Sequence, residues 1–208
     1  MADGATFHCS LLSALCSPMK TYFTSDQHFE HANLIEKMGR VGFSSMSEHD
    51  EAVLDAINAK VPREAWLVLL GDFCWTNPRK WRQRIRCKHV RFVLGNHDKP
   101  AQCQAAFGEW RHILEHKTEA LGKVVCCHYP IAFWPRSHHG AYHLYGHCHD
   151  SRETTLDAWA PERRSMDVGV DSALRLLGSP APFSEDEIFE LLAARDGHDP
   201  VTFYRGES

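Results

Sequence analysis

The sequence lacks both a long hydrophobic run and a basic segment at its start. A weakly apolar stretch runs from Phe7 to Cys16, with Asp3 before it and no lysine or arginine. This stretch is too short to span a bilayer, and it lacks the positive charge that begins a secretion signal. Met19 is followed at once by the first expected strand. We therefore expect residues 1–18 to be a dispensable N-terminal extension and residues 19–208 to form a single domain.

The chain also lacks a C-x-x-C pair, although it contains 8 cysteines. The missing pair disfavours a structural zinc site, and the missing secretion signal disfavours a disulfide framework. We therefore expect reduced thiols in a cytoplasmic protein.

The chain also lacks a large excess of charge of either sign, because its formal net charge is only -4. Charged residues make up 24% of the sequence and hydrophobic residues 43%. These values are typical of globular proteins and exclude a disordered, collagen-like or membrane protein. They indicate no global attraction to nucleic acid or anionic lipid, and no obligate protein partner is evident. The unusual count is that of histidine, with 15 copies, and imidazole is the commonest metal ligand.

Apolar runs of strand length recur along the chain, and each is followed by polar residues. The runs are 22–24, 66–70, 90–94, 124–127 and 142–145. Because polar and apolar residues do not alternate in them, they indicate strands buried on both faces, as in a sheet covered by helices.

Helical patterns lie between these runs. Ser47 and Asp50 resemble a capping box at the start of one helix, which Pro62 ends. Ser184 and Glu187 begin another in the same way. This alternation of strands and helices predicts a layered α/β fold with functional residues at the carboxyl ends of strands.

Two short motifs place metal-binding side chains two residues apart. They are Asp26-Gln27-His28 and His147-Cys148-His149. In an extended backbone, side chains two residues apart point the same way, so each pair is able to hold one ion. Taken alone, a turn with two exposed polar side chains is the favoured explanation of the first motif.

Three further strand ends carry functional groups. Asp72 follows Gly71, the segment 95–98 reads Gly-Asn-His-Asp, and His128 follows the run 124–127. Individually, Asp72 is explained by a simple turn and His128 by a buried histidine bound to a backbone carbonyl. The glycines allow the backbone to turn sharply and to approach an ion closely.

The order of these motifs resembles the calcineurin-like metallophosphoesterase superfamily, over the chain from about Tyr22 to Leu192. Within that superfamily, the sequence of residues 24–31, 128–130 and 167–171 is similar to that of a small bacterial and phage branch of generic phosphoesterases. The resemblance implies a layered α/β/β/α sandwich of the metallophosphoesterase type and a centre of two divalent metal ions.

The resemblance also assigns ligands to the two ions. The first ion would be held by Asp26, His28, Asp72 and His149. The second would be held by Asp72, Asn96, His128 and His147. Asp72 is then the bridging carboxylate between two cations about 3.5–4 Å apart. Oxygen and nitrogen ligands permit Mn²⁺, which we expect, as well as Fe, Zn²⁺, Co²⁺ or Ni²⁺.

A centre of this kind hydrolyses a phosphoester by attack of a metal-bound hydroxide on phosphorus, in line with the leaving oxygen. His97, which is not assigned as a ligand, is the candidate to protonate the leaving group. Asp98 is a second catalytic candidate that positions this loop; a cap or ion pair without a catalytic part explains it equally well.

Trp75 and Thr76 depart from the pattern of the Ser/Thr protein phosphatases, which have an aspartate and an arginine there. Double-strand-break repair nucleases have a histidine in place of Trp75. We therefore expect a phosphodiesterase acting on nucleotides or nucleic acid. The alternatives are a small-molecule phosphomonoesterase and, in another class, a nucleic-acid-binding module with a structural metal centre.

Candidate substrate contacts are His31, Asn33 and Arg40, although an exposed polar loop explains them equally well. The stretch 79–88 is strongly basic and contains Trp81, which suits the stacking of a nucleic-acid base. An amphipathic helix that buries Trp81 and Ile85 is the favoured interpretation of this stretch.

Overall fold

The computed structural model describes residues 19–36, 39–40 and 42–195, and the predicted extension 1–18 lies outside them. No helix in these ranges is both long and apolar enough to cross a membrane. The six cysteines within them are free thiols, as expected.

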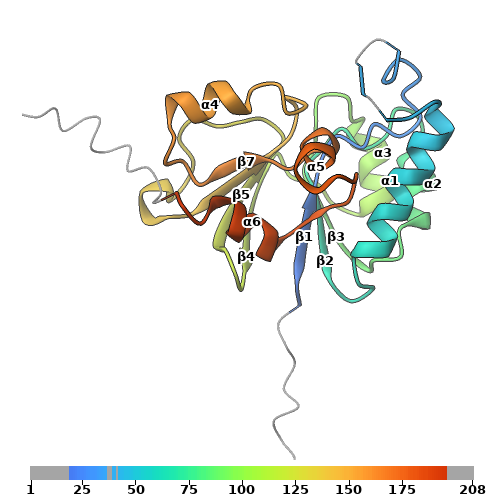
Figure 1. The fold of residues 1–208 in the computed structure, drawn as a ribbon. Helices are drawn as coiled ribbons and strands as arrows, with labels where there is room; N and C mark the ends of the chain where they lie inside the picture. The colour runs from blue at the N-terminus through green and yellow to red at the C-terminus, as the bar shows by residue number, and fades with distance from the viewer. Residues whose placement is uncertain (1–18, 37–38, 41, 196–208) are drawn as a thin grey trace, which may run out of the picture.

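Two four-stranded sheets form the centre of the fold (Figure 1). The first has the order β3-β2-β1-β8, with bounds His89–Phe92, Trp66–Leu69, Thr21–Thr24 and Phe183–Ser184. The second has the order β4-β5-β6-β7, with bounds Ile113–Thr118, Gly122–Cys127, Tyr142–Tyr145 and Ser165–Asp167. Strands β1, β2 and β3 are parallel to one another, as are β5, β6 and β7.

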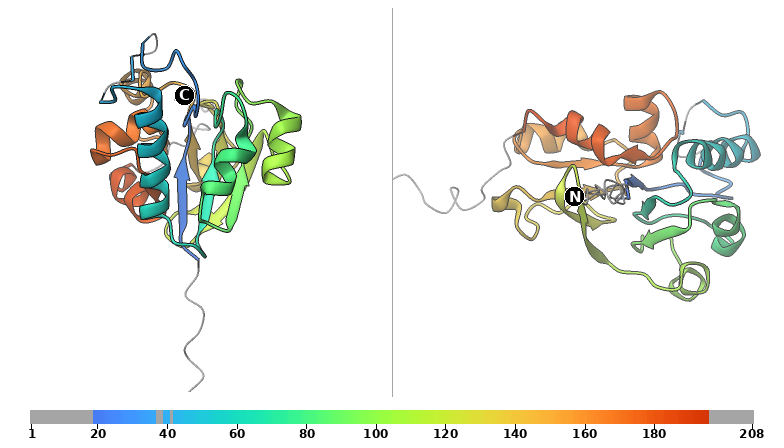
Figure 2. Two further views of the ribbon diagram at one scale, coloured as in Figure 1. Left: turned by 90° about the vertical axis from the view of Figure 1, so that its right-hand side faces the viewer. Right: turned by 90° about the horizontal axis from the view of Figure 1, so that it is seen from below.

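Helices flank the sheets. Their bounds are Met46–Lys60 for α1, Pro78–Arg84 for α2, Pro100–Phe107 for α3, Glu153–Trp159 for α4, Val170–Leu177 for α5 and Glu185–Leu192 for α6. The side of the molecule that carries α1, α2 and α3 faces the viewer in the left panel of Figure 2. Helix α4 lies over the second sheet (Figure 1), where the Tyr145 hydroxyl on β6 donates to Glu153.

The apolar side chains of β2 divide between two cores. Leu67 and Leu69 pack with α1 and α2, whereas Val68 and Leu70 pack between the sheets against residues such as Val124 on β5. Both faces of this strand are therefore buried, which explains its apolar run without alternation. Together with α4 on the outer face of the second sheet, this arrangement confirms the predicted α/β/β/α layering.

The five predicted strands are present, and β4, β7 and β8 were missed. The capping box at Ser184 and Glu187 is confirmed. The one at Ser47 and Asp50 is wrong, because α1 begins at Met46 and its cap is Ser45, whose hydroxyl accepts from the Glu48 amide.

The first part of the basic stretch lies in α2, which ends at Arg84 with Ile85 as its C-cap, and the aromatic residue of the stretch is buried. Trp81 is only 3% exposed and stacks on Phe29, with ring centroids 4.3 Å apart and planes at 6°. Ile85 is buried as well. The amphipathic interpretation is therefore confirmed, and the alternative that Trp81 stacks on a nucleic-acid base is wrong.

We expect Trp81→Ala to lower the free energy of unfolding by about 3–5 kcal/mol, because it removes a large buried ring from the core. Urea denaturation measures the change. Trp159→Ala is the matched control, since Trp159 is 56% exposed, and its expected cost is below about 1 kcal/mol. An equal loss in both variants would contradict the burial of Trp81.

Candidate metal centre

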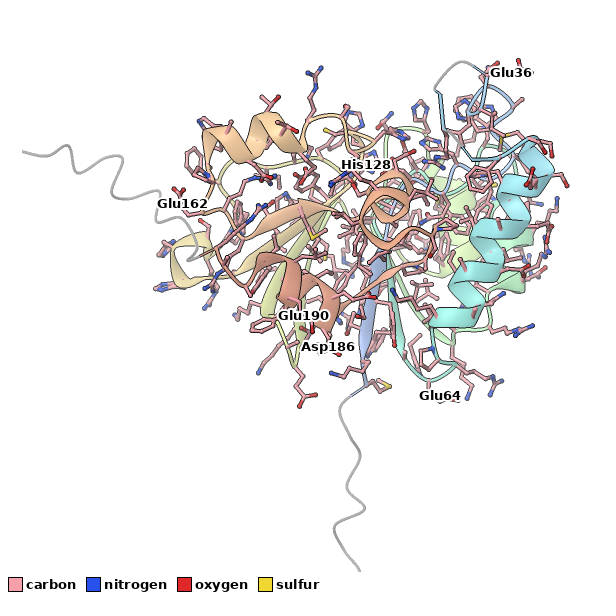
Figure 3. The ribbon with its side chains drawn as sticks, viewed as in Figure 1. Glu36, Glu64, His128, Glu162, Asp186 and Glu190 are labelled. Carbon is pink, nitrogen blue, oxygen red and sulfur yellow. The ribbon has the colours of Figure 1, made fainter. Side chains whose placement is uncertain are left out.

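The predicted metal ligands follow the ends of parallel strands. Thr24 on β1, Leu69 on β2 and Phe92 on β3 are paired in register, so these strands end at the same level. The second sheet meets the first at this edge, because His128 Nδ1 donates to the carbonyl oxygen of Leu70 at 2.8 Å. Figure 3 labels His128 at the upper ends of the strands. The structure brings together all seven predicted ligands there: Asp26, His28, Asp72, Asn96, His128, His147 and His149.

One group of donors consists of Asp26, His28 and His149. Asp26 Oδ1 lies 3.7 Å from His28 Nε2 and 3.8 Å from His149 Nε2. Asp26 Oδ1 and His28 Nε2 are buried and have no hydrogen-bond partner. Because buried polar atoms without partners are costly, the pair fits a cation that both atoms would bind.

A second group surrounds His128. Its Nε2 atom lies 3.4 Å from Asp72 Oδ2 and 3.0 Å from Asn96 Oδ1. Asn96 Oδ1 also lies 2.9 Å from His147 Nδ1. Since His128 Nδ1 donates its hydrogen to Leu70, replacement of the Nε2 proton by a cation would leave the Nε2 lone pair to bind it, beside these oxygen atoms. This set of nitrogen and oxygen donors fits a second divalent cation.

Asp72 lies between the two groups. Its Oδ2 atom is 3.7 Å from His28 Nε2 in the first group and 3.4 Å from His128 Nε2 in the second. Its other oxygen, Oδ1, accepts from the His97 amide at 2.9 Å, which fixes the carboxylate. This position supports the bridging role that the resemblance implies.

The backbone at the predicted ligands is not extended. The expectation that an extended backbone aligns the outer side chains of Asp26-Gln27-His28 and His147-Cys148-His149 is therefore wrong. Five of the ligands have positive φ: Asp26 (59°), His28 (50°), Asp72 (52°), His147 (69°) and His149 (48°). Residues other than glycine rarely adopt this left-handed backbone conformation, and such strain is concentrated at functional sites. Asp26 and His28 converge on one group of donors with this conformation. His147 and His149 instead lie in different groups, so the expectation that this second pair holds one ion is wrong.

Gly71 and Gly95 allow close approaches at the centre. A Cβ atom on Gly95 would lie 2.2 Å from Asp72 Oδ1, so a side chain there would displace the carboxylate. A Cβ atom on Gly71 would lie 2.6 Å from the Gly95 amide nitrogen and 2.8 Å from His128 Nδ1, and Gly71 has a φ of +94°. The predicted close approach of the backbone is therefore made to the carboxylate by Gly95, and to the Gly95 backbone and the His128 ring by Gly71.

The electrostatics of the centre favour cations. Burial lowers the pKa of His28 to about 2, so its imidazole is neutral and able to bind a metal. Burial also acts to lower the pKa of His128, but the carboxylates of Asp72 and Asp26 outweigh it and raise the value to about 9. Burial acts to raise the pKa of Asp72, yet contact with His128 lowers it to about 2. The centre thus holds ionised carboxylates that attract positive charge.

Arg40 does not occupy the place predicted for a substrate contact. It is 3% exposed, and its guanidinium donates to Asp171 Oδ1 and Oδ2 at 3.0 and 2.7 Å. It also donates to the backbone oxygens of Asp26 and Gln27. Because these groups occupy the guanidinium, Arg40 holds the backbone of the first motif from behind rather than contacting a phosphate.

Asp171 is a functional residue that the sequence reasoning did not single out, although the segment 167–171 had been noted. Its Oδ2 atom accepts from His149 Nδ1 at 2.7 Å, which leaves His149 Nε2 for a metal. Burial acts to raise the pKa of Asp171, but the hydrogen bond from His149 and the charge of Arg40 lower it. Asp171 therefore stays ionised and orients His149.

His97 lies beside the ligands with its side chain 40% exposed, and its Nε2 atom is 3.9 Å from Asp72 Oδ2. Asp98 points elsewhere, because its carboxylate accepts from the amides of Asp72, Phe73 and Gly95 at 2.8 to 3.0 Å. Asp98 therefore positions the two ligand-bearing loops, in agreement with the positioning role that was expected, and a direct catalytic part for it stays a prediction.

His31 and Asn33 follow the first motif. His31 is 6% exposed, and its ring lies 5.3 Å from the ring of His28, while Asn33 is exposed. Trp75 stacks on His31, with centroids 4.2 Å apart and planes at 5°. His31 therefore supports Trp75 beside the centre, and a contact of His31 or Asn33 with substrate stays a prediction.

The comparisons with known proteins agree with this architecture. No family model matches the chain. An uncharacterized protein from Methanocaldococcus jannaschii is 28% identical over 159 residues, which cover 74% of this chain and 84% of that protein. A protein of unknown function from Aquifex aeolicus has a TM-score of 0.65 and 22% identity, and the match covers 84% of this chain and 100% of that one. The α/β fold is shared with it.

A phosphoesterase from E. coli, YfcE, is a weaker structural match. Its TM-score is 0.41 and its identity is 19%, over 63% of this chain and 70% of its own.

We expect Asp171→Asn to weaken Mn²⁺ binding about 10- to 100-fold, because the neutral amide orients His149 less firmly than the carboxylate does. Isothermal titration calorimetry on chelator-stripped protein measures the affinity. Asp186→Asn is the matched control, because Asp186 is exposed and pairs with Lys20. Unchanged affinity in a folded Asp171→Asn variant would rule out the orienting role.

Proposed function

We propose that this protein is a dinuclear metal-dependent phosphoester hydrolase, and specifically a phosphodiesterase that acts on nucleotides or nucleic acid. The observation that carries the proposal is the position of the Asp72 carboxylate between two groups of donors, one of which contains buried atoms without a partner. Two cations that share a carboxylate form the arrangement that suits in-line displacement at phosphorus.

The first ion would be held by Asp26, His28, Asp72 and His149, and the second by Asp72, Asn96, His128 and His147. When bound, the two ions would lower the pKa of water and neutralise charge on the phosphoryl group. Mn²⁺ is the metal that we expect, and Fe, Zn²⁺, Co²⁺ and Ni²⁺ are also compatible with these donors.

His97 would deliver the proton to the leaving oxygen. Its exposed ring adjoins Asp72, and its backbone amide is tied to the same carboxylate. The ring is therefore positioned beside the bridging carboxylate while its edge remains open to a substrate. A general acid in such a position contributes about 10²–10⁴ to the rate.

A diester suits this centre better than a monoester. Arg40, the predicted contact for phosphate, is committed to Asp171, and Trp75 lies beside His97 with a ring separation of 5.3 Å. A monoester carries up to two negative charges that call for additional cationic contacts. A diester carries one charge and a second organic group, which an exposed aromatic ring accommodates.

The non-enzymatic alternative, a nucleic-acid-binding module with a structural metal centre, loses part of its basis. Its base-stacking residue was Trp81, which is buried under Lys80 and Arg84. In addition, a structural site has no use for an exposed non-ligand histidine such as His97 beside the ligands.

The test compares hydrolysis of bis-p-nitrophenyl phosphate and p-nitrophenyl phosphate by stripped protein refilled with Mn²⁺. We expect metal-dependent cleavage with preference for the diester. His97→Ala should lower kcat by about 10²–10⁴ with unchanged metal content. Asp72→Asn should lose both bound metal and activity.

His89→Ala is the matched control, because His89 begins β3 at the opposite end of the sheet and pairs with Glu64. Faster cleavage of the monoester would favour a phosphomonoesterase. Failure to cleave either ester with any of the five metals, in protein that binds single strands, would favour the binding module.

A further inference from the structure

Two large aromatic side chains are exposed beside the candidate metal centre. Trp75 and Tyr129 are each 42% exposed, although aromatic rings of this size dominate the cores of proteins. Trp75 follows Asp72 closely in sequence, and Tyr129 follows His128 directly. Each ring is therefore placed by a loop that also carries a metal ligand.

Trp75 lies on the side of the first group of donors. Its indole stacks on His31 at 4.2 Å and lies 5.3 Å from the ring of His97. The His31 ring lies 5.3 Å from that of the ligand His28. Because His31 is only 6% exposed, it forms a fixed support that holds the indole in place while the rest of the indole faces solvent.

Tyr129 lies on the side of the second group. Its ring meets those of His128 and His147 edge to face, with centroids 5.0 and 4.8 Å apart. His128 and His147 are both predicted ligands of the second group, and neither belongs to the first. The two aromatic rings therefore adjoin different halves of the centre.

We propose that Trp75 and Tyr129 are stacking platforms for the two nucleosides that flank the scissile phosphodiester of a single-stranded nucleic acid. This inference rests on the proposed phosphodiesterase function and names its substrate class. A phosphodiester held between the two groups of donors extends one nucleoside towards Trp75 and the other towards Tyr129. Leaving-group protonation by His97 then occurs next to the base that stacks on Trp75.

A single strand fits these platforms better than a duplex does. Bases stack on protein aromatic rings when they are unpaired and splayed apart, and every base offers a planar face, so such contacts tolerate any sequence. In a duplex the base faces are covered by neighbouring pairs. We therefore expect cleavage with weak sequence preference and strong preference for single strands.

The test uses the full-length, Mn²⁺-loaded protein and two short DNA strands. One is an oligothymidylate, and the other is the same strand with abasic residues on both sides of one phosphodiester. Wild-type protein should cleave that bond in the abasic strand with a higher KM. Trp75→Leu and Tyr129→Leu should each raise KM for the normal strand roughly 5- to 100-fold, which corresponds to the loss of one stacked base.

The readout that separates stacking from a structural role is the abasic strand. If the rings act as platforms, Trp75→Leu and Tyr129→Leu leave its cleavage at the abasic phosphodiester nearly unchanged, and Trp75→Phe and Tyr129→Phe recover most of the KM for the normal strand. If Trp75 merely supports His97, the leucine variant lowers kcat on both strands alike, and the proposal is overturned.

Phe189→Leu is the control for loss of an exposed aromatic ring, because Phe189 lies on α6 and is 46% exposed. One outcome would overturn this inference and leave the proposed function intact. In it, the wild type cleaves bis-p-nitrophenyl phosphate, but neither leucine variant changes the KM for the normal strand. An inactive wild type on every diester would overturn both. Equal cleavage of single and double strands would overturn the choice of single strands.

Discussion

The hydrogen bond from His128 Nδ1 to the carbonyl oxygen of Leu70 joins the two sheets at the candidate metal centre. Leu70 follows β2 in the first sheet, and His128 follows β5 in the second. The His147 amide, which donates to Asp26 Oδ2 at 2.9 Å, makes a second contact between the loops of the two sheets. The apolar core between the sheets, which includes Val68 and Val124, keeps the two strand ends together and makes the bond possible.

The centre is costly to fold. Buried carboxylates, buried polar atoms without partners and left-handed ligand residues each oppose folding by roughly 1–3 kcal/mol. Their cost is offset by supporting contacts that lie outside the donor sets. The Asp98 carboxylate accepts hydrogen bonds from three backbone amides. The Arg40 guanidinium donates to two backbone oxygens and to Asp171. These hydrogen bonds tie Asp98 and Arg40 to the backbone of the loops that carry the donors.

The sequence allowed the strand ends and their ligands to be predicted, because apolar runs followed by donors form a local pattern. It did not reveal Arg40 or Asp171 in their observed roles, since 131 positions separate the two residues. Strand β8 has two residues and β7 has three, so neither offers a periodic signal. The left-handed backbone at Asp26 could not be predicted either, because long-range contacts impose it against the local preference of the residue.

The unpartnered atoms Asp26 Oδ1 and His28 Nε2 have a thermodynamic consequence. A cation that satisfies them binds the native chain and not the unfolded one, so each bound ion stabilises the fold by RT ln(1 + [L]/Kd). At a free concentration one hundred times Kd, this linkage is worth about 2.7 kcal/mol. The free energy of unfolding of this chain would therefore increase with the supply of metal.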